Sequence, residues 1–378
     1  MKVVIAIDSF KGSLSSIDAA DAVAKGILKV DPEAIIVKKP LADGGEGTVD
    51  GLTEGMGGTL VYCDVTGPLG DVVQAKYGIV DNLAIMEMAQ ASGLTLVPEE
   101  KRNPLNTTSY GVGEMIKHAL DNGISEFIIG IGGSATNDGG IGMLSALGIK
   151  FLDKNGNVLS GYGRDLEQIN SIDVRNIDPR ISNCKFEIAC DVDNPLCGKR
   201  GASYIYGPQK GASPEVVEQL DKAMQNYANL SKLALAKDFE NYSGAGAAGG
   251  LGYAFKCYLE ADLKPGIQIV MDKVNIEEDL KDADLLITGE GRLDAQTAMG
   301  KAPVGVAKLA KKYDCDTVAL SGIATYEAGI VNEHGIDAYF TILQQLVNLE
   351  EAMKTEVAAQ NLQITAEQVY RLWNLNKK

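Results

Sequence analysis

The apolar positions at the start of the chain predict alternating strands and helices. Residues 2–8 form an almost continuous apolar run, as in a parallel strand buried on both faces. Ser15-x-x-Asp18 then predicts a helix start, and apolar residues recur at helical spacing until Asp31-Pro32. A second short apolar run over 34–37 predicts another strand. This strand–helix–strand start is typical of a doubly wound sheet.

The same alternation returns near the end of the chain. Apolar runs predict strands over 283–288, 317–321 and 338–343 and a helix over 304–312. The spacing Thr365-x-x-Gln368 predicts the start of a final helix. Both ends of the chain therefore carry the pattern of one parallel α/β domain.

The middle of the chain has a different pattern. Residues 58–88 contain short alternating segments separated by turn signals, and 153–156 (DKNG) is a hairpin signal. These features favour antiparallel or mixed strands. We therefore predict an α/β fold: a Rossmann- or flavodoxin-like parallel-sheet domain (1–59 plus 274–378) with an inserted mixed-sheet α/β domain (60–273).

Charge and composition exclude several classes of protein. Thirty-five Lys+Arg against 51 Asp+Glu give a net charge of −16, which argues against nucleic-acid or anionic-membrane partners. No apolar run approaches the ~20 residues of a membrane helix. The six cysteines form no CxxC pair and are typical of reduced thiols, so we expect a cytoplasmic protein. With only two histidines, we expect a carboxylate as any general base.

A glycine-rich segment at 132–140 (GGSATNDGG) lies between a predicted strand (127–131) and a predicted helix (141–147). Glycine lets the backbone approach a ligand, and N–H groups at a helix start attract anions. The alternative is a tight turn whose polar residues only cap the helix. The candidate binding residues here are Gly133, Ser134, Thr136 and Asn137.

Three further loops, each after a predicted strand, combine carboxylates with glycines or cations. Ligands of doubly wound sheets bind beyond the carboxyl ends of strands, although each loop is also explained as a solvated surface turn. The candidates for holding Mg²⁺ are Asp43, Glu46 and Glu290. Lys11 and Arg292 are candidates for a phosphate or carboxylate. The other candidate binding residues are Asp8, Ser13, Gly44, Gly45, Gly289 and Asp294.

A fifth loop, CDVDNP at 190–195, follows the apolar run 186–189. Asp191 or Asp193 is placed to accept a proton from a substrate hydroxyl, and we favour Asp191. The alternative is an Asx turn before proline. Glycines 244, 246 and 249 match a dinucleotide fingerprint, but the preceding residues do not have a strand pattern. The chain has no GxxxxGK[ST], HRD or DFG motif, which excludes P-loop and protein kinases.

Six motifs in order resemble those of the bacterial type I glycerate kinase family. They are DSFKGSL (8–14), PLADGGEGT (40–48), GGSATNDGG (132–140), CDVDNPL (190–196), GAAGGLG (246–252) and TGEGRLDAQT (288–297). The resemblance implies an ATP-dependent glycerate kinase that uses Mg²⁺ and acts on D-glycerate. It favours 2-phosphoglycerate over 3-phosphoglycerate as the product.

Two other functions stay open at this point. The glycine fingerprint and the doubly wound sheet motivate a nicotinamide-dependent hydroxy-acid oxidoreductase. A non-catalytic sugar-acid-binding regulator would share the glycine loops and cations, but it would gain nothing from clustered carboxylates. The sequence also leaves open whether the protein is a homodimer.

Overall fold

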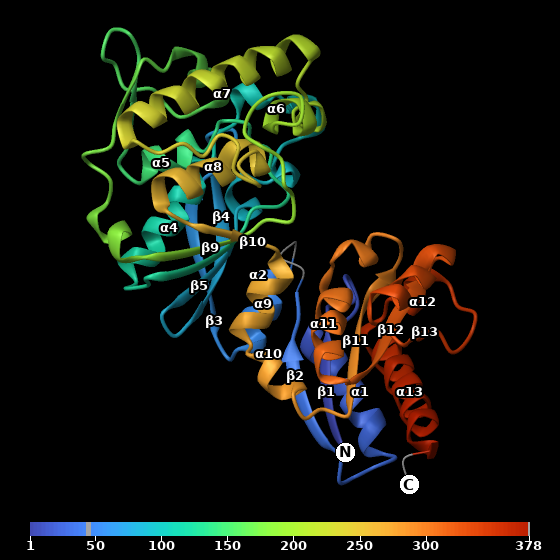
Figure 1. The fold of residues 1–378 in the computed structure, drawn as a ribbon. Helices are drawn as coiled ribbons and strands as arrows, with labels where there is room; N and C mark the ends of the chain where they lie inside the picture. The colour runs from blue at the N-terminus through green and yellow to red at the C-terminus, as the bar shows by residue number, and fades with distance from the viewer. Residues whose placement is uncertain (43–46, 377–378) are drawn as a thin grey trace. The chain divides into compact units, whose positions relative to one another are not determined.

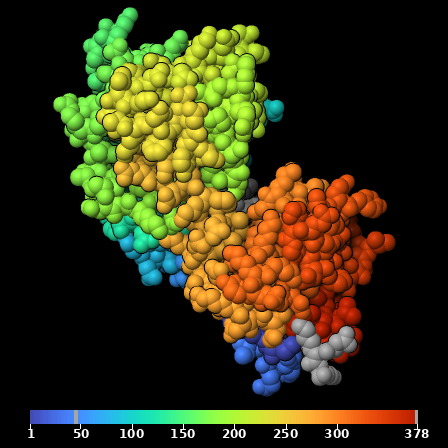
Figure 2. Space-filling model, viewed as in Figure 1, coloured from blue at the N-terminus to red at the C-terminus, as the bar shows by residue number. Residues whose placement is uncertain are grey.

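The computed structural model describes residues 1–42 and 47–376. The candidate residues Asp43, Gly44, Gly45 and Glu46 therefore lie outside the described residues. The described chain forms two compact units. Unit 1 contains residues 1–42, 50–57 and 267–376, and unit 2 contains 47–49 and 58–266. In the space-filling view, the blue start and the orange and red end of the chain share one body, and green and yellow residues form the other (Figure 2).

Unit 1 is built on a five-stranded, fully parallel sheet in the order β13-β12-β11-β1-β2. Its strands are β1 (Lys2–Ile7), β2 (Ile35–Pro40), β11 (Leu285–Leu293), β12 (Asp316–Ala324) and β13 (Ala338–Thr341). Blue and orange strands lie side by side in it because β1 pairs directly with β11 (Figure 1). The order is flavodoxin-like, so the predicted parallel-sheet fold is confirmed.

Unit 2 is built on a six-stranded mixed sheet in the order β10-β9-β6-β5-β4-β3. Strands β3 to β5 run antiparallel, and β5, β6, β9 and β10 run parallel, which confirms the predicted mixed sheet. These strands are β3 (Thr59–Thr66), β4 (Val72–Val80), β5 (Leu83–Glu87), β6 (Glu126–Gly130), β9 (Lys185–Ala189) and β10 (Asp262–Lys264). A two-stranded sheet joins β7 (Lys150–Leu152) to β8 (Ser171–Asp173).

The α-helices in chain order are α1 (Ser16–Leu28), α2 (Thr48–Gly55), α3 (Ala89–Ser92), α4 (Tyr110–Asp121), α5 (Ile141–Ala146), α6 (Ala202–Tyr206), α7 (Pro214–Leu235), α8 (Ala247–Leu259), α9 (Gly266–Lys273), α10 (Ile276–Leu280), α11 (Ala302–Ala310), α12 (Leu349–Ala352) and α13 (Thr355–Trp373). The 3₁₀ helices are η1 (Leu94–Leu96), η2 (Glu99–Lys101), η3 (Pro104–Asn106), η4 (Gly163–Gln168), η5 (Pro179–Asn183), η6 (Pro208–Lys210), η7 (Thr297–Met299), η8 (Lys311–Tyr313), η9 (Tyr326–His334) and η10 (Asn374–Asn376). None of the described helices is both long and apolar enough to cross a membrane.

Helices cover both faces of the unit 1 sheet. Ile5 and Ile287 belong to an apolar cluster with side chains of α1 and α13. Ala319 points to the other face, where it packs with side chains of α11. The Ser15 hydroxyl accepts a hydrogen bond from Asp18 N at 3.1 Å, which confirms the predicted helix start.

The prediction that the last helix begins at Thr365 is wrong. Helix α13 begins ten residues earlier, at Thr355. The Thr365 hydroxyl donates to Asn361 O at 2.9 Å, one turn back within the same helix. A threonine in a helix interior commonly makes this bond, and its sequence pattern imitates a cap.

Candidate active site

The chain changes direction across the unit 1 sheet between β1 and β11. From β1 it continues through α1 to β2 on one side, and from β11 it continues through α11 to β12 on the other. The helices α1 and α11 cover opposite faces, so the loops after β1 and β11 diverge. Such a switch point, outside the carboxyl ends of the strands, is where open α/β sheets bind ligands. The motif at 8–14 follows β1, whereas the motif at 288–297 covers the last six residues of β11 (288–293) and the four residues after it.

Asp8 is the first residue after β1, and its side chain is buried. Its amide donates to Gly289 O at 2.9 Å, and its carboxylate accepts from Ser9 N at 2.6 Å. Position 289 requires glycine, since a Cβ there would lie 1.9 Å from Leu320 O. The approach of Gly289 to Leu320 packs β11 against β12, and the bond from Asp8 N to Gly289 O holds the residue after β1 beside β11.

The outer part of β11 carries the charged candidates. Glu290 accepts a hydrogen bond from the Thr297 hydroxyl at 2.6 Å. Arg292 Nε lies 3.3 Å from Asp294 Oδ2, and the arginine side chain is 62% exposed. A guanidinium this exposed stays accessible to an incoming phosphate or carboxylate.

The remaining candidates at the carboxyl ends of these strands, Lys11 and Ser13, lie in the loop after β1. Lys11 is exposed, and the half-buried Ser13 donates its hydroxyl to Phe10 O at 3.0 Å. The Ser13 side chain therefore holds its own turn. Lys11 adds a second positive charge to the loops at the switch point.

The carboxylates of Asp8 and Glu290 are of the kind that magnesium prefers in proteins. Within residues 1–42 and 47–376, no three His, Cys, Asp or Glu side chains come together as a metal site. Mg²⁺ bound to phosphates keeps several waters and needs only one or two protein carboxylates. Asp8 directly follows β1, Glu290 lies in the neighbouring strand β11, and both side chains supply oxygens of that kind.

In unit 2, the segment 132–140 follows β6 and the segment 190–195 follows its neighbour β9. Only Gly132 and Gly133 of the glycine-rich segment are exposed. Ser134 is 8% exposed, whereas Thr136 and Asn137 are fully buried. A ligand at the end of β6 would therefore contact the backbone of Gly132 and Gly133 and the small exposed part of Ser134.

The expected anion site at the start of α5 is not formed. The Asp138 carboxylate already accepts from Gly140 N at 3.1 Å and Gly142 N at 3.4 Å. Met143 N donates to the Ser109 hydroxyl at 3.0 Å. The amides of Gly140, Gly142 and Met143 therefore already have acceptors and are not available to an anion. Helix α5 is also only six residues long.

The glycine-rich segment 244–250 packs closely against the glycine-rich segment 132–140. Ala248, Gly249 and Gly250 all have positive φ, and a right-handed helix follows from Leu251. Gly139 N donates to Gly249 O at 2.9 Å, and a Cβ on Gly249 would lie 2.0 Å from Thr136 O. The segment 244–250 therefore packs against 132–140.

No strand precedes Gly244, because residues 236–243 form only turns and irregular structure. The fingerprint of a nicotinamide-binding domain requires a strand at that place. The structure therefore removes the fingerprint, one of the two observations that motivated an oxidoreductase.

Asp191 is exposed just beyond the end of β9. Its Oδ1 accepts from Gly266 N, beyond the end of β10, at 3.0 Å. The alternative base, Asp193, pairs with Arg200 at 3.1 Å on the surface. Asp191 thus combines solvent access with a fixed orientation, as a base at a strand end requires.

The sequence analysis missed two polar side chains that form hydrogen bonds with the segment 132–140. The Asn137 amide donates to the Ser203 hydroxyl at 2.9 Å, and Lys210 Nζ donates to Ser134 Oγ at 2.7 Å. Ser203 and Lys210 belong to α6 and η6, more than 60 residues away in sequence. No local pattern marks either of them, because their burial depends on contacts distant in the chain.

The sequence was also compared with models of known protein families. A model of the glycerate kinase family matches residues 3–374. The chain belongs to the glycerate kinase family. The sequence resemblance that rested on six motifs is confirmed.

Members of the glycerate kinase family from several bacteria are similar to the chain over nearly its full length. A glycerate kinase of Haemophilus influenzae is 50% identical over 374 residues, covering 98% of each chain. A glycerate 2-kinase of Escherichia coli strain K12 is 50% identical over 356 residues, covering 94% of this chain and 93% of that one. The crystal structure of a candidate glycerate kinase 2 from Salmonella typhimurium LT2 is 47% identical, with a TM-score of 0.92 over 100% of this chain and 99% of that one.

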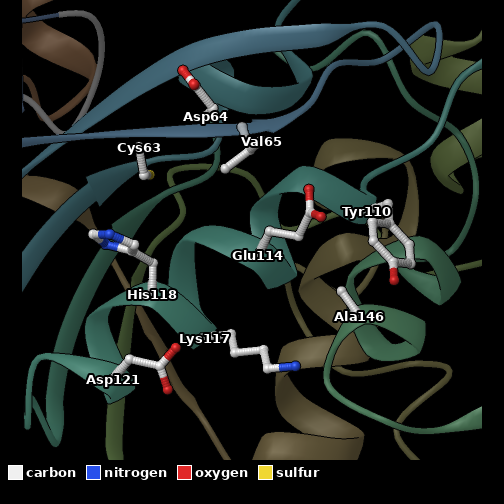
Figure 3. Close-up of a pocket in the computed structure, with 9 residues that line it drawn as sticks. All are labelled: Cys63, Asp64, Val65, Tyr110, Glu114, Lys117, His118, Asp121 and Ala146. Atoms are coloured by element: carbon white, nitrogen blue, oxygen red, sulfur yellow. The ribbon is translucent and has the colours of Figure 1, made fainter.

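A separate cavity of about 200 Å³ in unit 2 does not suit the anionic substrates of a glycerate kinase (Figure 3). It lies between β3 and α4, and none of the candidate residues lines it. Its walls carry the carboxylates of Asp64, Glu114 and Asp121 against the single ammonium of Lys117. The negative excess opposes an anion.

Proposed function

We propose that this member of the glycerate kinase family transfers the γ-phosphoryl group of ATP to the 2-hydroxyl of D-glycerate, giving 2-phosphoglycerate and ADP. The observation that carries the proposal is the family match over residues 3–374, at about half identity to glycerate kinases. The name of the Escherichia coli relative, a glycerate 2-kinase, supports the 2-hydroxyl over the 3-hydroxyl as the acceptor.

Phosphoryl transfer needs positioning and charge stabilisation rather than covalent chemistry by the protein. We assign Asp8 and Glu290 to the Mg²⁺ that accompanies ATP, together with Asp43 and Glu46. Arg292 and Lys11 face solvent at the same strand ends and would neutralise charge on the transferred group or on the glycerate carboxylate.

We assign Asp191 as the general base. It would accept the proton of the glycerate hydroxyl while that oxygen forms a bond to the γ-phosphorus and the bond between this phosphorus and the β,γ-bridging oxygen breaks. The leaving oxygen carries the electron pair away as part of ADP. The hydrogen bond from Gly266 N to Asp191 Oδ1 orients the carboxylate beyond the end of β9.

The reaction is tested by measuring ADP release from ATP and Mg²⁺ with D-glycerate, followed by phosphorus NMR of the product. We expect ADP release that depends on both glycerate and Mg²⁺, and a single signal from 2-phosphoglycerate. L-Glycerate serves as the control for stereochemistry. A 3-phosphoglycerate signal would contradict the proposed acceptor atom. Tight glycerate binding without ADP release would instead indicate the sugar-acid-binding regulator.

A further inference from the structure

A lysine of unit 2 is buried against the segment that follows β6. Lys210 is the last residue of η6 and is 2% exposed. Its Nζ donates to Ser134 Oγ and to Thr136 O, each at 2.7 Å. Both acceptors belong to the segment that follows β6, two to four residues beyond Gly132.

This ammonium group has no salt bridge among the described residues. Lysine is rarely buried without a carboxylate partner, since removing its charge from water is costly. Burial lowers the pKa of Lys210 to about 7, and the negative charge of Asp138 opposes that shift. Below that pH the ammonium form predominates, and the neutral oxygens around Nζ do not cancel its positive charge, which therefore acts on the nearby backbone.

The bond to Ser134 also fixes the direction in which that serine can donate. A serine hydroxyl has two acceptor lone pairs and one hydrogen. Because Lys210 donates to Ser134 Oγ, it engages a lone pair and leaves the serine hydrogen for another acceptor. Donors polarised in this way form stronger hydrogen bonds. Ser134 keeps 8% exposure beside Gly132 and Gly133, where an acceptor can approach.

The segment is anchored at several other points that do not involve Lys210. Ala135 N donates to Ser92 O at 2.9 Å, and Leu94 N donates to Gly133 O at 2.8 Å. The Thr107 hydroxyl donates to Ala135 O at 3.1 Å. The fold of the segment therefore does not depend on the lysine alone, and a charged group is not required for anchoring.

We propose that Lys210 is a positioning residue for substrate binding: it orients the Ser134 hydroxyl as a donor and supplies positive potential to Gly132 and Gly133, so that this strand end binds an anionic phosphate or carboxylate group. The inference rests on the proposed phosphoryl transfer for the identity of the substrate. The anion-binding property does not depend on the reaction and can be measured separately.

The test compares the wild-type protein with Lys210→Met, which keeps most of the side-chain length and removes the charge. At about pH 6, where the Lys210 ammonium is protonated, we expect the dissociation constant for inorganic phosphate, measured by calorimetry, to rise about tenfold or more. The KM for D-glycerate or ATP should rise by a similar factor while kcat changes less. Lys154→Met, at an exposed position of the 153–157 turn, is the matched control.

A double-mutant cycle separates this role from simple structural support. In the Ser134→Ala background, Lys210→Met should weaken phosphate binding by only about twofold, because the oriented serine donor is already lost and only the effect of the charge on Gly132 and Gly133 remains. Ser203→Ala removes the hydrogen bond from the Asn137 amide. Its effect on phosphate binding should add to that of Lys210→Met, because the two residues contact different parts of the segment. Equal effects of Lys210→Met in both backgrounds would overturn the proposal.

If Lys210→Met does not fold, Lys210→Gln replaces it, since the amide retains one donor without the charge. Phosphate affinity and both KM values within about twofold of the wild type would overturn the proposal. Absence of phosphate binding by the wild-type protein would also overturn it. In contrast, phosphate binding that depends on Lys210 in a protein with no glycerate-dependent ADP release would support the anion site and reject the proposed function.

Discussion

Ser109 holds the Asp138 carboxylate with two hydrogen bonds of 2.7 Å, one from its backbone amide and one from its hydroxyl. The same hydroxyl accepts from Met143 N. Burial raises the pKa of Asp138, and these bonds, together with those from Gly140 and Gly142, favour its charged form. One serine therefore links the start of α4 to the start of α5.

Replacing Ser109 by alanine should lower the free energy of unfolding by about 1–3 kcal/mol, because it leaves a buried carboxylate and a buried amide with fewer partners. Urea unfolding measures the change. Ser145→Ala, on α5 itself, removes only a hydroxyl bonded to Ile141 O and should cost less than about 0.5 kcal/mol. Equal losses in the two variants would contradict the linking role of Ser109.

The interlocked glycines give a second stability prediction. Gly249→Ala should destabilise the protein by about 2–4 kcal/mol, because a Cβ would collide with Thr136 O and φ is +67°. Gly132→Ala is the control, since a Cβ there has no atom within 4 Å. Thermal unfolding of both variants tests the difference. A Gly249→Ala protein as stable as Gly132→Ala would show that the two segments do not pack as described.

Asp191→Asn should lower kcat by about 10²–10⁴-fold with little change in KM, since asparagine can still accept the bond from Gly266 N but cannot take a proton. Steady-state kinetics with D-glycerate measure both constants. Asp193→Asn, which breaks only an exposed pair with Arg200, should keep near-normal turnover. Near-normal turnover of Asp191→Asn would remove that residue from the reaction.

Glu290→Gln should raise the Mg²⁺ concentration needed for half-maximal activity by about tenfold, as expected for loss of one carboxylate near the ion. The amide oxygen can still accept from Thr297, so the loop should stay in place. Glu333→Gln, exposed in η9, serves as the control. A Mg²⁺ dependence unchanged from the wild type would place the ion elsewhere.

The buried lysine predicts a pH-dependent stability difference. The folded pKa of Lys210, about 7, lies below the unfolded value of 10.5, so between these pH values the unfolded chain binds a proton that the folded chain lacks. The wild type should therefore gain stability relative to Lys210→Met as pH rises from 7 to 9, by at most roughly 2–3 kcal/mol. Urea unfolding at several pH values measures this. Parallel curves would mean that the folded protein retains the proton.

Strands that are buried in parallel sheets were predicted well from the sequence. The apolar run at 2–8 became β1 (Lys2–Ile7), because burial on both faces leaves a continuous signal. The start of α13 was missed because Thr365 carries a cap-like pattern in a helix interior. Local patterns mark strands more reliably than the ends of helices.

The sequence predicted which candidate residues lie near the ends of strands, but not which side chains they contact. Charged or glycine-rich loops follow β1, β6 and β9, and the connection of each loop to its strand is local in sequence. The predicted strand 283–288 ends too early, because β11 continues to Leu293 and includes Glu290 and Arg292. The partners that decide which polar groups remain available are distant: Ser109 occupies the start of α5, and Lys210 orients Ser134 across 76 residues. Such pairings depend on tertiary packing, which a periodic pattern does not encode.

The pairing of β1 with β11 has a consequence for synthesis of the protein. Val3 lies opposite Leu285, and α1 packs against α13, near the end of the chain. A ribosome releases the N-terminus first, so β1 and α1 emerge with most of their partners not yet translated. Unit 2 can complete its sheet once β10 has emerged, whereas unit 1 must wait for the final helix. The newborn chain therefore carries an exposed apolar strand through most of its translation, a period in which a chaperone would protect it from aggregation.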